Sequence, residues 1–109
     1  MMAHRSGASE TPTELADLER DLRTLKSDLL QLEIDYKMFF AGQRKRPPYV
    51  LRSTVEALVR RLDRSSIQGS GERFRFNTLH HRFRTFVNLW NREVRIREEG
   101  RSGPFSRST

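Results

Sequence analysis

The sequence lacks cysteine altogether. This absence excludes disulfides, thiolate metal sites and thiol nucleophiles, and it is compatible with a reducing compartment. No apolar run approaches the roughly 18 residues that a membrane-spanning helix needs, and the first residues lack the apolar stretch of a secretory signal. We therefore expect a cytoplasmic protein with no membrane partner.

Catalytic and metal-binding patterns are missing as well. The chain contains no HExxH motif and no glycine-rich phosphate loop. His80 and His81 are the only histidines outside the first ten residues. Successive helical residues point about 100 degrees apart, so these two imidazoles cannot share one metal ion. We expect no enzymatic activity, no cofactor and no metal site.

Polar segments flank the region that we expect to fold. A length of 109 residues suits one domain, and 35% apolar residues suffice for a core despite 32% charged residues. Residues 1–10 and 101–109 are small, polar and without periodicity, so they bury too little apolar surface to offset their ordering entropy. The sequence predicts two disordered tails around a helical domain at residues 11–100.

Residues 12–41 carry the clearest helical pattern. Thr11 is a predicted N-cap, Pro12 suits the first helical position, and Glu14 completes a capping box. Gly42 supplies the stop. Between these signals the apolar residues recur at alternating spacings of three and four, which is typical of a coiled-coil seam: Leu15, Leu18, Leu22, Leu25, Leu29, Leu32, Tyr36 and Phe39.

Two further helices are predicted at about residues 48–63 and 72–98. Pro47-Pro48 ends one helix and starts the next, and a serine- and glycine-rich turn follows the second helix. Short connections favour antiparallel neighbours. The fold class is therefore all-α: an elongated three-helix bundle with a long, coiled-coil-like first helix. The core-facing arc of the third helix contains Phe76, Leu79, Phe83, Phe86, Val87, Trp90 and Val94.

In this arrangement the third helix packs on the C-terminal half of the first helix and leaves the N-terminal half uncovered. A contiguous exposed apolar seam usually marks an interface. The predicted protein-interface residues are Leu15, Leu18, Leu22 and Leu25.

The charges beside this seam disfavour a homodimer, although they do not exclude it. In a parallel pair, Glu14 would face Glu19 across the dimer, and Asp28 would face Glu33. Acidic positions would also meet in an antiparallel pair. We expect the seam to contact the basic helices of its own chain or a basic helix of another protein.

Charge is distributed unevenly along the chain. Residues 1–41 hold five basic and eight acidic side chains (net −3), whereas residues 42–109 hold sixteen basic and six acidic ones (net +10). Most of the basic residues are arginines, which favour bidentate contacts with phosphates and carboxylates. A GC-rich genome would explain the excess of arginine over lysine, but not the difference between the two parts of the chain.

A polar stripe on the third helix lies opposite its apolar arc. Arginine and asparagine side chains match phosphate oxygens and base edges, and two basic clusters flank the second helix. A solvated helix face has a similar composition, and cations near a helix C-terminus stabilise the helix dipole, so both alternatives stay open. The predicted nucleic-acid contacts are Arg44, Lys45, Arg46, Arg60, Arg61, His81, Arg84, Asn88, Asn91, Arg92 and Arg95.

Several short motifs lie between about residues 32 and 101. They are Asp35-Tyr36-Lys37, Phe39-Phe40-Ala41-Gly42, Arg46-Pro47-Pro48, the run from Arg73 to Leu79, and Arg82-Phe83 with Trp90. This segment resembles a family of bacterial, myxobacterial-type helical domains that have no assigned activity. The resemblance implies a helical fold and transfers no functional residue to this chain.

The leading functional hypothesis is a non-enzymatic helical binding module whose basic half contacts nucleic acid or a ribonucleoprotein surface. The alternative is a coiled-coil protein-protein adaptor or scaffold that uses the acidic leucine seam, with a basic helix as its partner, or that docks its basic half on an acidic protein.

Overall fold

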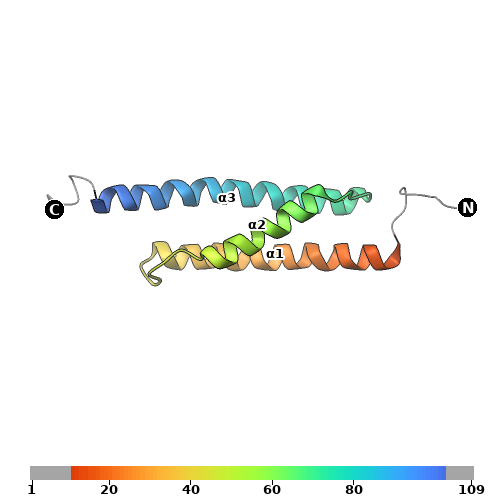
Figure 1. The fold of residues 1–109 in the computed structure, drawn as a ribbon, viewed down its shortest axis with the longest axis horizontal. Helices are drawn as coiled ribbons and strands as arrows, with labels where there is room; N and C mark the ends of the chain where they lie inside the picture. Colours follow the sequence, from red (N-terminus) through yellow and green to blue (C-terminus); the bar gives the residue numbers. More distant parts are fainter. Residues whose placement is uncertain (1–10, 103–109) are drawn as a thin grey trace, which may run out of the picture.

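The computed structural model describes residues 11–102, which form three helices and no strand. Helix α1 spans Pro12–Phe40, α2 spans Tyr49–Arg64 and α3 spans Ser70–Ser102. Figure 1 shows that α1 and α3 lie side by side and run in the same direction, while α2 returns obliquely across them. The predicted elongated, all-α, three-helix arrangement with a long first helix is confirmed. The predicted N-terminal tail and most of the C-terminal one lie outside the described residues, and α3 continues to Ser102.

The ends of α1 follow the sequence signals. The Glu14 amide donates to the Thr11 hydroxyl, and the Thr11 amide donates to a Glu14 carboxylate oxygen, both at 3.0 Å. Gly42 adopts a φ of 84°, where a residue without a Cβ is favoured, and its amide donates to the Phe39 carbonyl. The capping box therefore fixes where α1 begins, and the glycine fixes where the chain turns away.

The link between α2 and α3 is extended and anchored. Ser65 leaves α2 with a ψ of 158°, and its hydroxyl donates to the Leu62 carbonyl at 2.7 Å. Ile67 is buried against the core, and its carbonyl accepts a hydrogen bond from Arg73. Because the link is extended, it carries the chain beyond the end of α2 before α3 starts.

As a result, α3 lies beside most of α1, with only the first residues of α1 extending past the start of α3 (Figure 1), and the expectation of an uncovered N-terminal half is wrong. With 33 residues, α3 is roughly 50 Å long, enough to match the 29 residues of α1. Leu18, Leu22 and Leu25 are only 7%, 1% and 0% exposed. Of the four predicted interface residues, Leu15 alone is exposed, so the seam is part of the core of this chain.

An aromatic stack fills the core near the end of α1. The rings of Tyr36 and Trp90 lie 4.1 Å apart and nearly parallel, and Phe86 stacks on Trp90 at 5.2 Å. Arg52 on α2 donates to the Tyr36 hydroxyl at 2.9 Å, so the one polar atom of this buried ring has a partner. All three helices therefore meet at Tyr36.

Candidate nucleic-acid interface

Some of the arginines form ion pairs within the fold. Arg61 on α2 contacts Asp21 at 2.7 Å. On α3, Arg75 makes two hydrogen bonds to Glu19, and Arg82 makes two to Glu33 at 2.6 and 2.8 Å. The acidic flanks of the seam therefore meet the basic helices of the same chain, as one of the two expectations proposed.

The two bidentate pairs shift the pKa values of Glu19, Arg75 and Arg82. The hydrogen bonds from Arg75 hold the pKa of the Glu19 carboxyl below its usual value. In the same way, the hydrogen bonds to Glu33 raise the pKa of Arg82. Both pairs are solvent-accessible, so they fix the register of α3 on α1 more than they stabilise the fold.

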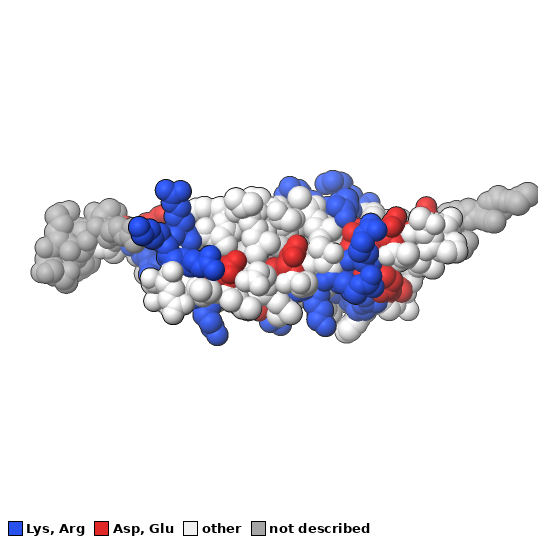
Figure 2. Space-filling view, turned by 90° about the horizontal axis from the view of Figure 1, so that it is seen from below, with Lys and Arg blue, Asp and Glu red and all other residues white. Residues whose placement is uncertain are grey.

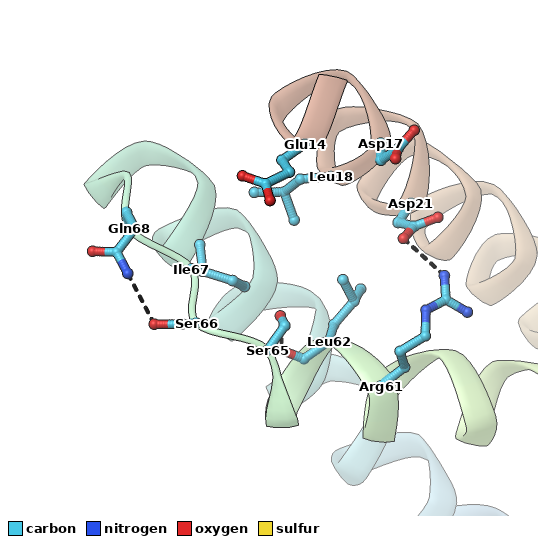
Figure 3. Close-up of a pocket in the computed structure, with 10 residues that line it drawn as sticks. All are labelled: Glu14, Asp17, Leu18, Asp21, Arg61, Leu62, Ser65, Ser66, Ile67 and Gln68. Carbon is cyan, nitrogen blue, oxygen red and sulfur yellow. Dashed lines mark hydrogen bonds and ion pairs between the residues drawn. The ribbon is translucent and has the colours of Figure 1, made fainter. Parts of the chain in front are cut away.

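Arg61 is accordingly a poor candidate for a phosphate contact, although the sequence pattern included it. It borders a pocket of about 480 Å³ between the start of α1, the end of α2 and the following link (Figure 3). Glu14 and Asp17 bring further carboxylates to this pocket, and Figure 3 shows Arg61 directed at Asp21. An acidic lining of this kind repels a phosphate, so this end of the bundle does not extend the predicted interface.

The outer face of α3 is exposed and polar, as the sequence predicts. We define this face by its six predicted residues, all of which are exposed. In the described part of the chain, no carboxylate lies within ion-pair distance of Arg84 or Arg92. The outer face comprises His81, Arg84, Asn88, Asn91, Arg92 and Arg95.

A carboxylate closes this face at its C-terminal end. Glu99 lies 4.0 Å from Arg95 across one helical turn, and both side chains are largely exposed. This pair was not among the predictions from the sequence, although an arginine and a glutamate four positions apart on one helix are a recognisable signal. The part of the outer face without carboxylates therefore ends at about Arg95.

The two remaining basic clusters do not join this face in one patch. Arg44, Lys45 and Arg46 are exposed in the turn after α1, whereas Arg60 is exposed near the far end of α2, so the clusters occupy opposite ends of the bundle (Figure 1). Arg44 also lies 4.0 Å from Asp35. On the side of the bundle seen in Figure 2, basic side chains form two separate groups, one at the left end and one right of the centre, with acidic ones nearby. The six residues on α3 are the largest group of predicted contacts on one element of the described chain.

Comparison with known proteins identifies no relative: no family model, no curated protein and no solved structure matches the chain. No helix within residues 11–102 is long and apolar enough to cross a membrane. Nor does any group of three metal-binding side chains occur among those same residues.

Proposed function

We propose that this protein is a non-enzymatic nucleic-acid-binding module of the cytoplasm, acting on free nucleic acid or on a ribonucleoprotein surface through the outer face of α3. One observation carries the proposal. The fold pairs Arg61, Arg75 and Arg82 with acidic residues of α1, but leaves Arg84 and Arg92 exposed beside asparagines on one helix face.

The dimensions of this face suit a polyanion. His81 and Arg95 are 14 positions apart, which corresponds to roughly 21 Å along a helix. Arginine forks bind phosphate oxygens, and asparagine can pair with the edge of adenine, so Arg84 and Arg92 would hold the backbone while Asn88 and Asn91 face the bases. A net charge of +7 adds long-range attraction to any nucleic acid.

The adaptor hypothesis receives no comparable support in its original form. It needed an accessible leucine seam, and Leu18, Leu22 and Leu25 are buried in the core of the bundle. Polar substitutions at these leucines would disrupt the core, so they cannot test binding to a partner.

Fluorescence-anisotropy titration with labelled duplex DNA and single-stranded RNA, across a series of salt concentrations, tests the proposal. Each phosphate contact contributes about 0.9 to the slope of log affinity against log salt for duplex DNA, and about 0.7 for a single strand. We expect Arg84→Glu/Arg92→Glu to weaken binding at least tenfold at low salt and to reduce the slope by about 1.8 for duplex DNA and about 1.4 for single-stranded RNA.

The matched control is Lys26→Glu/Lys37→Glu on α1. Each charge reversal lowers the net charge by two, so the net charge of both double variants falls from +7 to +3. If the outer face binds nucleic acid, the control loses far less affinity than the α3 variant. Equal losses would show that only net charge matters, and a wild-type affinity independent of salt would refute the proposal outright.

A further inference from the structure

A groove runs between α1 and α3 on the side that α2 does not cover. Its wider part has a volume of about 560 Å³ and is lined by Leu30, Ile34, Leu89 and Trp90 among others. A second part of about 420 Å³ continues toward the start of α3, between Leu22 and Phe74. A small recess containing Leu29 and Leu79 joins the two. Every residue lining these three spaces belongs to α1 or α3.

The apolar residues at this groove are unusual for their positions. In the heptad pattern of α1, Leu30 and Ile34 occupy the outermost positions, which normally carry polar side chains. They are 46% and 51% exposed. On the other wall, Leu89 lies outside the core-facing arc of α3 and is also exposed. The groove therefore presents apolar surface that the core of this chain does not use.

The geometry suits a helix as the occupant. Two long helices that run side by side form a surface groove, and a further helix packs into such a groove with its axis 8–10 Å from its neighbours. Here α2 fills one side of the α1–α3 pair, and the open side corresponds to the fourth position of a four-helix bundle. From Phe74 to Trp90 the groove extends over roughly 24 Å, which matches a helix of about 16 residues.

The charges at the rim define the chemistry of that helix. The carboxylates of Glu19 and Glu33 are already bound by Arg75 and Arg82. Lys26 and Lys37 are exposed at the groove, and no ion pair involves either lysine in the described part of the chain.

Arg23 adds another positive charge at the rim, against one further carboxylate, Glu93. A second copy of this chain would bring the same positive rim against itself, whereas a helix with acidic flanks would complement it.

We propose that the groove between α1 and α3 binds an amphipathic helix of a partner protein, with an apolar stripe against Leu30, Ile34 and Leu89 and acidic residues beside Lys26 and Lys37. This is recognition of a helix in a groove, on a surface separate from the outer face of α3.

The experiment uses an 18-residue peptide with leucine at heptad positions a and d and glutamate at e and g. A second peptide carries lysine at e and g. Trp90 is the sole tryptophan of the chain and borders the groove from the core, so a bound peptide should change its fluorescence. We expect the glutamate peptide to bind with micromolar affinity, at least tenfold more tightly than the lysine peptide, and to change the Trp90 emission.

Variants on exposed positions separate this site from others. Ile34→Glu should weaken binding of the glutamate peptide at least tenfold. Val50→Glu is the matched control, because Val50 is 83% exposed on α2, away from the groove. Lys26→Glu/Lys37→Glu should also weaken peptide binding, whereas Arg84→Glu/Arg92→Glu should not. For nucleic acid the expected effects of these two double variants are reversed. Each proposal can therefore fail without the other.

Three results would overturn the proposal. The first is equal binding of the two peptides, or no binding of either peptide at high micromolar concentration. The second is an equal loss in the Ile34→Glu and Val50→Glu variants. The third is a wild-type dimer in sedimentation that Ile34→Glu converts to a monomer, because a second copy would then occupy the groove.

Discussion

Replacing Leu22 by alanine tests whether α2 and α3 cover the N-terminal half of α1 in solution. Leu22 is 1% exposed and lies among the core residues of all three helices. Truncating a buried leucine removes its transfer free energy and leaves a cavity, and the two effects together lower the free energy of unfolding by about 3 kcal/mol. For a domain of this size such a loss lowers Tm by roughly 12–24 °C.

The matched control is Leu30→Ala on the same helix. Both changes substitute alanine for leucine at a helix-interior position, so the effect of helix propensity is the same. Leu30 is 46% exposed, and we expect its truncation to lower the free energy of unfolding by less than about 1 kcal/mol. The difference between the variants therefore isolates the coverage of the seam.

Urea denaturation followed by Trp90 fluorescence and far-ultraviolet circular dichroism measures both variants. The Leu22→Ala midpoint should fall with an unchanged m value, because the same surface is exposed on unfolding. Similar midpoints for Leu22→Ala and Leu30→Ala would refute the packing of α2 and α3 over the N-terminal half of α1. The leucine seam would then be exposed, and it would again be a candidate protein interface.

Three further changes address the cap, the aromatic stack and an interhelical ion pair. Thr11→Ala removes the capping box and should lower the free energy of unfolding by about 1 kcal/mol in thermal denaturation, with no change if α1 frays before Glu14. Tyr36→Phe deletes the acceptor for Arg52 and should cost about 1 kcal/mol by urea denaturation; a neutral result would mean that water satisfies the guanidinium equally well. Because Arg75 lowers the pKa of Glu19 in the folded state, the stabilisation from this carboxylate is present above the ordinary glutamate pKa and is lost as pH falls through the lowered value. Carbon-detected NMR titration should show the Glu19 pKa returning toward its usual value in Arg75→Gln, and an unchanged pKa would contradict the pairing.

The helices were predictable because their signals are local. The capping box at Thr11, the glycine at position 42 and the proline pair before α2 each act through neighbouring backbone groups. The predicted helices at 12–41, 48–63 and 72–98 agree with α1, α2 and α3 to within a few residues. The apolar arc of α3 also follows from periodicity alone.

The register of α3 on α1 was not predictable in the same way, because it depends on the path of five residues. Short turns suggested that α3 starts beside the end of α2, but Ser65 is extended and Ile67 is buried, which moves the start of α3 toward that of α1. The pairing of Arg61 with Asp21 follows from this tertiary arrangement, so no local pattern could remove Arg61 from the predicted contacts. The groove had a local signal, the apolar residues Leu30 and Ile34 outside the seam.

The pairing of α1 with α3 has a consequence for how the protein assembles. Residues that join these helices are 56 and 49 positions apart in the chain, whereas Arg52 and Tyr36, which join α1 and α2, are 16 apart. Closing a longer loop costs more conformational entropy, so the α1–α2 hairpin should form first and α3 should dock last.

The groove depends on that last step, since α1 and α3 each provide one of its walls. A ligand in the groove would therefore bind the fully assembled chain only, and it would raise the stability of the whole bundle by mass action.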